Sequence, residues 1–391
     1  MSVIGIVCEF NPFHNGHKYL IDYVKKDGDI VVCVMSGNFV QRGEPAIFPK
    51  EVRVKTALLN GADIVLELPF VYATASAELF ASSAVEILNS FGCDKIAFGT
   101  EDATIEQLEN AVEIMFSKDF DSNIKKYLEE GVSYPKARQM AFEEYKYNCD
   151  IVSPNNILAI EYIRAIKKNN YKITPLIVNR KGADYNDNFA VEEFASATYV
   201  RNCINKNIDF KKYVPSNAYK LYKTTLEDGN YINAEKFDLI VLSILRSKGE
   251  IEPNMANIAE GLENRISTAI KNSLSLAELY DNVKTKRFTH SRIRRTVLST
   301  VMNLESNKLK ISVPYCRLLG FNTNMVKNIG DFAKKCSLPF VVNYSDILNL
   351  NSKNALIVFG FEDKSTNLYN LALEKTKMCS TEKTYSLIKV K

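Results

Sequence analysis

Short apolar runs alternate with longer amphipathic stretches along the first hundred residues of the chain. The apolar runs have the length of buried strands and cover residues 2–10, 29–37, 62–69 and 94–101. The stretches between them show helical spacing, and two of them end in glycine; they cover residues 17–26, 50–61 and 75–92. This alternation predicts an α/β fold with a doubly wound, Rossmann-like parallel sheet, which binds ligands beyond the carboxyl ends of its strands.

The pattern changes further along the chain. An acidic helical stretch at 103–150 leads to a helix at 155–168, a sheet-like run at 173–180 and the start of another helix at 195–204. Residues 217–306 then read mainly as helices, and the apolar runs 339–349 and 354–363 predict a small βα addition. We therefore expect a catalytic α/β domain at 1–205 and a mostly α-helical region at 206–391.

Charge separates the same two parts. The net charge of the 391 residues is only +4. Residues 1–200 carry 20 Lys and Arg against 28 Asp and Glu, whereas residues 201–391 carry 30 against 18. A basic half favours a polyanion such as nucleic acid, although a solvated lysine-rich surface would have the same composition.

Cysteine spacing and hydropathy point to a cytoplasmic protein. None of the eight cysteines forms a C-x-x-C pair, so neither a zinc site nor a disulfide framework is expected. The first apolar run is short and lacks a basic segment before it, which argues against a signal peptide. No apolar stretch approaches the roughly 20 residues that span a bilayer. We expect no membrane association and no obligate protein partner.

The run His14-Asn15-Gly16-His17 follows the first predicted strand and opens the first predicted helix. A helix start at this position of a doubly wound sheet offers free N–H groups to a phosphate. The two imidazoles would lie on one side of the first turn and stabilise charge on an α-phosphate. A surface or metal-binding histidine pair is the alternative.

A second candidate phosphate site lies at Ser196-Ala197-Thr198-Tyr199-Val200-Arg201. Its hydroxyl groups would open a helix, and Arg201 would bind phosphate oxygens. An ordinary capped helix is the alternative.

These motifs carry a resemblance. His14 to His17 resembles the H-x-G-H signature of the nucleotidyltransferase superfamily, and Ser196 to Arg201 resembles its S-S/A-T-x-x-R element. Seven segments in this order resemble the bacterial tRNA(Met) cytidine acetate ligases: GIVCEFNPFHNGH, SGNFVQRGEPA, GADIVLELP, FGTE, SPNNILAIEYI, RKGADYND and ASATYVR. In the second half, HSRIRRTVLSTVMNL and PYCRLLGFN look like the family's carboxyl-terminal pattern.

The resemblance implies a reaction in two steps. Acetate and ATP form acetyl-adenylate and pyrophosphate, and the acetyl group then passes to N4 of the wobble cytidine of elongator tRNA(Met). The product is N4-acetylcytidine, and acetyl-CoA is not required. His14, His17 and Arg201 would be catalytic, and Mg²⁺ would arrive with ATP, held mainly by its phosphates.

The resemblance also implies a set of ATP-binding residues. One segment would supply most of them: Val7, Cys8, Glu9, Phe10, Asn11, Pro12, Phe13, His14, Asn15, Gly16, His17, Lys18, Tyr19 and Leu20. The others would be Gly99, Asn155, Arg180 and Ser196, with Asn156 as a neighbouring alternative to Asn155. The polar loop with Ser36, Asn38, Gln41 and Arg42 would line the acetate pocket, hold tRNA or form a simple surface loop.

A basic cluster at 284–295 is the candidate tRNA contact, through Lys286, Arg287, Arg292, Arg294 and Arg295. The apolar spacing of Ile293, Val297 and Val301 predicts that the three later arginines project away from the core. Phe288 and His290 would stack on an unpaired base. A solvated helical face is the alternative.

Two further candidates are interpreted as structural, and two other functions remain open. Asp63 and Glu67 resemble metal ligands, but we expect Asp63 near a strand start and Glu67 paired with a cation. Cys8 is not expected to form an acyl-thiol, because no neighbour in the sequence activates it. The rival functions are a small-molecule adenylyltransferase and an RNA-binding protein with a vestigial nucleotide fold.

Overall fold

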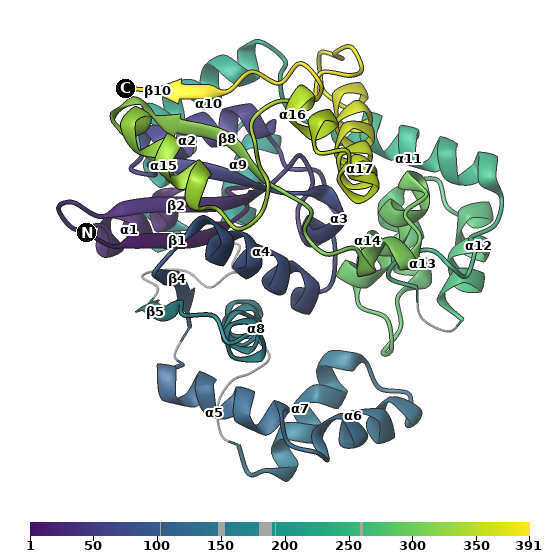
Figure 1. Cartoon of the computed structure of the whole chain (residues 1–391). Coiled ribbons are helices and arrows are strands. Elements are labelled where there is room, and N and C mark those ends of the chain that lie inside the picture. The colour runs from purple at the N-terminus through teal and green to yellow at the C-terminus, as the bar shows by residue number, and fades with distance from the viewer. Residues whose placement is uncertain (102, 148–152, 180–189, 192, 259–260) are drawn as a thin grey trace.

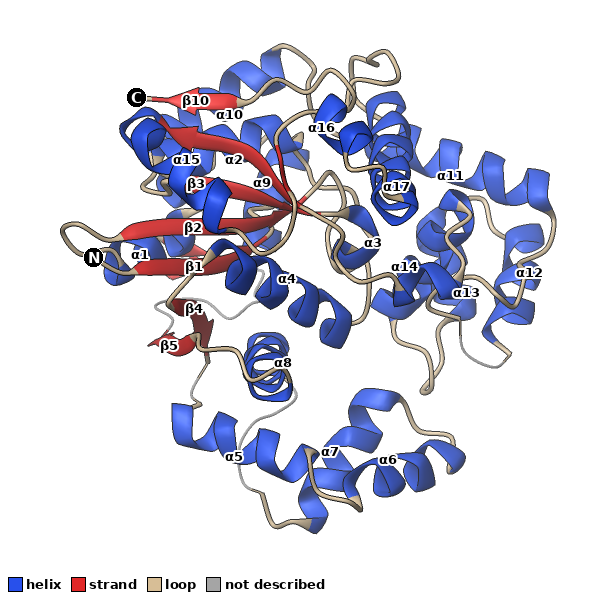
Figure 2. Cartoon of the chain, in the orientation of Figure 1, coloured by secondary structure: helices blue, strands red, loops and turns tan. Residues whose placement is uncertain are grey.

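A computed structural model describes residues 1–101, 103–147, 153–179, 190–191, 193–258 and 261–391. Its central feature is a twisted sheet with helices on both faces (Figure 1, Figure 2). Five parallel strands come from the first half of the chain: β1 (Val3–Cys8), β2 (Ile30–Ser36), β3 (Ile64–Leu68), β4 (Lys95–Thr100) and β5 (Thr174–Asn179). The predicted doubly wound α/β fold is confirmed.

The strand order places β1 at a topological switch point. The order in the sheet is β10-β8-β3-β2-β1-β4-β5, so the chain winds one way from β1 to β3 and the other way from β4 to β5. β1 pairs in parallel with β2 and with β4, for example Gly5 with Val32 and with Ile96. The crevice at the carboxyl ends of β1 and β4 is where such a sheet binds its ligand.

Alternate residues of the strands belong to two separate cores. On one face, Val32 and Leu66 join a core with α4 (Ala77–Phe91) and α8 (Pro154–Lys168). On the other face, Ile6 and Val31 join a core with α1 (Asn15–Val24), α2 (Lys50–Leu59), α9 (Ala197–Asn205) and α10 (Ser216–Glu227). A Cβ on Gly5 would lie only 2.6 Å from Leu88 Cδ2, so this glycine lets α4 pack closely on β1.

The remaining helices extend the molecule beyond the sheet. The short α3 (Phe70–Ala73) follows β3, and α5 (Ile105–Met115), α6 (Phe120–Glu129) and α7 (Tyr134–Glu144) lie beyond α8 in Figure 1. The second half adds α11 (Ala234–Lys248), α12 (Leu262–Asn272), α13 (Leu276–Val283), α14 (His290–Met302), α15 (Val326–Lys335), α16 (Tyr344–Asn349) and α17 (Lys353–Leu371). Short 3-10 turns cover Lys211–Tyr213, Ser306–Lys310 and Thr323–Met325, and β6 (Ala190–Val191) pairs with β7 (Phe194–Ala195).

The second half also contributes strands to the main sheet. β8 (Cys316–Asn322) pairs antiparallel with β3, and β9 (Phe340–Val341) and β10 (Ile388–Val390) pair in parallel with β8. The larger core likewise contains residues from both sides of residue 205. The predicted boundary at residue 205 between a catalytic domain and a helical region therefore stays a prediction about function. The apolar run 354–363, predicted to be part of a small βα addition, lies inside α17. In the described part of the chain, none of the helices combines the length and apolar character needed to cross a membrane.

Candidate functional site

A cavity of about 800 Å³ opens at the carboxyl ends of β1 and β4, within the size range of small-molecule sites. Both halves of the chain line it. The first half contributes the β1–α1 turn, the end of β4, and the starts of α7, α8 and α9, and the second half contributes Asn257 and the start of α14. The predicted switch-point crevice is therefore a real cavity that the helical half helps to enclose.

His14 and His17 are held by the start of α1. His14 is the N-cap, and its Nδ1 accepts a hydrogen bond of 3.1 Å from the Gly16 N–H. His17 Nδ1 accepts one of 3.2 Å from the His14 N–H, and the two ring centroids are 3.8 Å apart. Because both Nδ1 atoms accept, the neutral rings carry their proton on Nε2. Each ring thus has a donor suited to a phosphate oxygen.

Gly16 makes this arrangement of the rings possible. A Cβ at this position would lie 2.9 Å from His14 Cε1 and 3.0 Å from its Nδ1. A larger residue would therefore push the His14 ring away from the helix start. The close approach of the His14 ring thus explains why the motif has a glycine at position 16.

Arg201 connects the second predicted phosphate motif to the turn between β1 and α1. Its Nη1 donates to the Asn11 carbonyl at 2.6 Å, and its Nη2 donates to Thr198 Oγ1 at 3.0 Å. Ser196 caps α9 by accepting a hydrogen bond of 3.0 Å from the Tyr199 N–H. Both Arg201 and Ser196 line the cavity together with the histidines. Two helix starts and a guanidinium thus converge on one place, an arrangement suited to a polyphosphate.

Most of the other residues implied by the resemblance also line the cavity: Val7, Cys8, Glu9, Phe10, Asn11, Gly16, Tyr19, Leu20, Gly99 and Asn155. Asn155 lines the cavity, whereas its neighbour Asn156 is buried and accepts from the Glu101 N–H at 3.4 Å. Arg180 lies outside the described residues.

Pro12, Phe13, Asn15 and Lys18 are not part of the cavity lining in the described chain, so their predicted contacts with ATP stay predictions. Phe13 is fully buried, Asn15 donates to two backbone carbonyls, and Lys18 pairs with Asp22.

Arg53 and Glu9 stabilise the cavity wall, and the role of Arg53 was missed from sequence. The buried Arg53 guanidinium donates to the carbonyls of Glu9 at 2.6 Å and Ser36 at 3.2 Å, which joins the ends of β1 and β2. The Glu9 carboxylate accepts from the Gln41 N–H at 2.7 Å, and burial raises its pKa. Arg53 stands between two valines in α2, and no local pattern distinguishes it from a surface arginine.

The basic cluster does not lie as predicted. Arg292 and Arg295 line the cavity instead of projecting away from the core. Arg294 pairs with Glu44 and lies 5.4 Å from the Tyr280 ring centroid, while Lys286 and Arg287 are exposed. The expectation that Phe288 stacks on a base is wrong, because its ring belongs to the core and is only 4% exposed.

Cys8 is a poor nucleophile in this environment. Burial raises the pKa of its thiol well above the usual value, and the neighbouring Cys33 adds to the effect. The thiolate needed for an acyl-thiol is therefore disfavoured, in agreement with the prediction.

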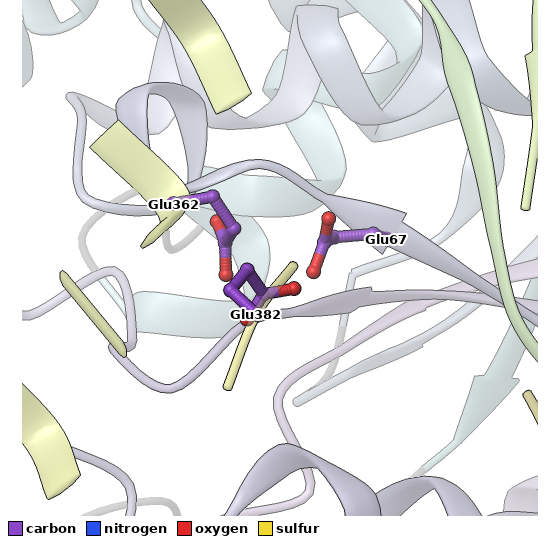
Figure 3. A group of neighbouring side chains, drawn as sticks. All are labelled: Glu67, Glu362 and Glu382. Atoms are coloured by element: carbon purple, nitrogen blue, oxygen red, sulfur yellow. The ribbon is translucent and has the colours of Figure 1, made fainter. Parts of the chain in front are cut away.

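The candidate metal ligands Asp63 and Glu67 are ion-paired. Asp63 lies 2.7 Å from Lys25 Nζ. Glu67, Glu362 and Glu382 direct their carboxylates toward one another (Figure 3). Lys50 Nζ lies 2.6, 3.0 and 2.7 Å from these three carboxylates, and Arg317 pairs with Glu67 and Glu382. An ammonium group thus takes the position that a cation would take, and the expected pairing of Glu67 is confirmed.

The buried cluster also supports the cavity. The Lys50 N–H donates to Asn38 Oδ1 at 2.9 Å, and Asn38 Nδ2 donates to Thr366 Oγ1 at 3.1 Å. Thr366 in turn donates to Glu382 at 2.8 Å. The loop that carries Gln41 into the cavity is thereby attached to the carboxyl-terminal segment.

Glu362 makes the folding stability depend on pH. Burial and the neighbouring Glu67 raise its pKa to about 7, which fits a cluster of three carboxylates and two cations that becomes neutral with one bound proton. The folded state then holds a proton that the unfolded state, with a pKa of 4.5, has released. Stability from this group is present below pH 4.5 and is lost as the pH rises through about 7.

We expect Glu362→Gln to remove the fall in folding stability that accompanies deprotonation of Glu362. The free energy of unfolding of the variant, relative to the original protein, should rise by about 1 kcal/mol between pH 6 and pH 8. Urea unfolding of both proteins at pH 6 and at pH 8 measures this change. The readout is the difference between the two proteins at each pH, not the stability of either one. A relative stability that is flat or falling over this interval would show that Glu362 does not bind the proton.

Comparisons with known proteins agree with this geometry. The family model described as HIGH Nucleotidyl Transferase matches residues 1–384. A tRNA(Met) cytidine acetate ligase of Caldicellulosiruptor bescii is 41% identical over 375 residues, covering 91% of this chain and 93% of that protein. One of Thermosipho africanus is 40% identical over 399 residues, covering 97% and 94%.

Two solved structures are also similar. The crystal structure of apo Thermotoga maritima TmcAL has a TM-score of 0.93, and that of TmcAL bound with alpha-thio ATP has a TM-score of 0.90. Each is 30% identical in sequence, and each comparison covers 100% of both chains.

Proposed function

Because the chain belongs to the HIGH nucleotidyl transferase family and to the tRNA(Met) cytidine acetate ligases, we propose that it acetylates tRNA at the expense of ATP. The substrates are acetate, ATP and elongator tRNA(Met), and the product is N4-acetylcytidine at the wobble position, made in the cytoplasm. The observation that carries the proposal is the convergence of His14, His17 and Arg201 at one end of the switch-point cavity.

The first step activates acetate. A carboxylate oxygen of acetate attacks the α-phosphorus of ATP in line, a new O–P bond forms, and pyrophosphate leaves with the electron pair of the broken bond. His14 and His17 donate through Nε2 to the phosphate oxygens, and Arg201 adds a fixed positive charge. Because hydrogen bonds already orient all three groups, little reorganisation is needed as charge develops.

Mg²⁺ would enter with ATP and neutralise part of its charge, held mainly by phosphates and water. Among the described residues, two of the cavity's carboxylates, Glu78 and Glu161, are ion-paired with arginines. The site therefore fits a Mg²⁺ ion that is held by the phosphates of ATP more than by protein carboxylates.

The second step transfers the acetyl group. The exocyclic amine of cytidine attacks the carbonyl carbon of the mixed anhydride, the amine loses a proton, and AMP leaves. The groups that held the α-phosphate now stabilise the leaving AMP. The anticodon base is already unpaired in its loop, so presenting it to the cavity costs less than opening a duplex.

The tRNA would approach from the helical half. We assign catalysis to residues 1–205 and tRNA contact to 206–391, through Lys286, Arg287, Arg292, Arg294 and Arg295. The enclosure of the cavity by the start of α14 supports this division of labour, because one helix then borders both the reacting centre and the exposed basic surface.

Labelled acetate tests the proposal directly. The protein is incubated with ATP, labelled acetate and total tRNA, and the tRNA is digested to nucleosides. We expect the label in N4-acetylcytidine only, with none when ATP is omitted. Label in another nucleoside, or none in tRNA, contradicts the proposal. Pyrophosphate release that depends on a mononucleotide instead of acetate would favour a small-molecule adenylyltransferase.

A further inference from the structure

Two arginines of α14 face the cavity without a carboxylate partner. In the described part of the chain, neither Arg292 nor Arg295 forms an ion pair, and both contact only backbone carbonyls. Arg292 Nε donates to the Asn257 carbonyl at 3.3 Å, and Arg295 Nη1 lies 3.5 Å from the Gln41 carbonyl. Arg295 Nε is buried and has no hydrogen-bond partner among the described residues. A buried charge in this state is costly unless an anion binds to it.

The pKa shifts of the two arginines favour the binding of an anion beside them. Burial, together with the smaller effect of the Arg292 charge, lowers the pKa of Arg295 to about 10. Burial also lowers the pKa of Arg292. The nearby charge of Arg287 contributes to the pKa shift of Arg292. Both guanidinium groups are therefore held in surroundings that disfavour their charge, and a phosphate bound to them would reverse this effect.

The neighbouring residue of the same helix shows the contrast. Arg294 lies between the two but pairs with Glu44 and stacks over Tyr280. Arg292 and Arg295 stand three residues apart, so they share one side of α14. Among the described residues, no carboxylate pairs with either of them as Glu44 pairs with Arg294, and both of them line the cavity.

Gln41 locates this pair beside the reacting centre. The Gln41 carbonyl lies against Arg295, and the Gln41 N–H donates to Glu9, directly after β1. Arg201 instead contacts Asn11, and His14 and His17 stand at the start of α1. The cavity thus has two groups of cationic and hydrogen-bond-donating side chains, attached to neighbouring parts of one loop.

We propose that Arg292 and Arg295 form a second phosphate-binding subsite, which holds the tRNA backbone phosphate next to the acceptor cytidine. The inference rests on the proposed function and deepens it. The triphosphate of ATP already has His14, His17, Ser196 and Arg201, so the second subsite is available to the other polyanionic substrate. It would fix the acceptor nucleotide so that its amine meets the anhydride.

Half-reactions distinguish tRNA phosphate from the phosphates of ATP. Arg292→Gln and Arg295→Gln are compared with Arg246→Gln, which removes the same charge at an exposed position of α11 outside the cavity lining. We expect each cavity variant to retain acetate-dependent ATP–pyrophosphate exchange within about 2-fold. We expect kcat/KM for tRNA and the affinity for an anticodon stem-loop to fall at least about 10-fold, as loss of a charged phosphate contact does. Arg246→Gln should change neither by more than about 2-fold.

The remaining outcomes overturn the inference. If the rate of ATP–pyrophosphate exchange fell as much as kcat/KM for tRNA, the two arginines would bind ATP or pyrophosphate instead of tRNA. If the affinity for the stem-loop were unchanged, they would not bind a tRNA phosphate. Melting temperatures guard against misfolding: removal of an unpaired buried charge should leave the melting temperature equal or higher, and a fall of several degrees would make Arg295 structural. If the original protein binds the stem-loop but transfers no acetyl group, the proposed function fails while the binding comparison still tests the subsite.

Discussion

Replacing His14 or His17 by alanine lowers the rate of acetate-dependent ATP–pyrophosphate exchange by about 100- to 1,000-fold, the effect of losing one fixed donor to a developing charge. Each ring is positioned by a backbone hydrogen bond to its Nδ1, which leaves Nε2 as the donor. The two rings also lie against each other, with centroids 3.8 Å apart. Loss of either should therefore disturb the other, and the double variant should be little slower than the single ones.

The third histidine of the chain is the matched control. His290 does not line the cavity, and its Nε2 lies 3.8 Å from the Asp281 carboxylate. His290→Ala should exchange pyrophosphate at the original rate. Normal exchange in His14→Ala and His17→Ala would refute their catalytic assignment.

Lys50→Met lowers the free energy of unfolding by about 3–5 kcal/mol, the cost of leaving buried charge unpaired. Lys50 is 1% exposed and contacts three buried carboxylates that come from β3, α17 and the segment after it. Burial alone would lower the pKa of Lys50, but the carboxylates Glu362, Glu382 and Glu67 raise it overall. Without the ammonium, Arg317 still pairs with Glu67 and Glu382, but Glu362 loses the cation with which it is paired. Urea unfolding followed by circular dichroism measures the loss.

Lys18→Met provides the comparison for a surface pair. Lys18 pairs with Asp22 on α1, and both side chains are partly exposed. Such a pair contributes about 0–1 kcal/mol, so this variant should unfold almost as the original protein does. If Lys50→Met lowered the free energy of unfolding by as little as Lys18→Met, the cluster would not stabilise the attachment of the carboxyl-terminal segment to the sheet.

The local parts of the site could be predicted from the sequence. The strands β1 to β4 and the longer helices between them follow from periodicity, because each is a continuous apolar or amphipathic run. The position of His14 and His17 follows from the same local pattern, since the motif stands where a strand gives way to a helix. Asn155 at the start of α8 and Ser196 at the start of α9 were placed for the same reason.

The parts that depend on distant contacts could not be predicted. Lys50 and Glu382 are 332 positions apart, and neither has a local pattern that requires a buried partner. The spacing of α14 identified its buried side correctly with Ile293 and Val297. It could not show that the opposite side of the helix meets a cavity made by another part of the chain. Tertiary packing, which periodicity does not encode, decides whether such an arginine meets solvent or a substrate.

A crystal structure of the protein with a non-hydrolysable ATP analogue would show directly where the α-phosphate binds. We expect the α-phosphate within hydrogen-bond distance of His14 and His17 Nε2, with Arg201 on the phosphates and the adenosine extending toward Gly99 and Asn155. An analogue bound elsewhere, or bound in this cavity with its phosphates out of reach of both imidazoles, would contradict this expectation.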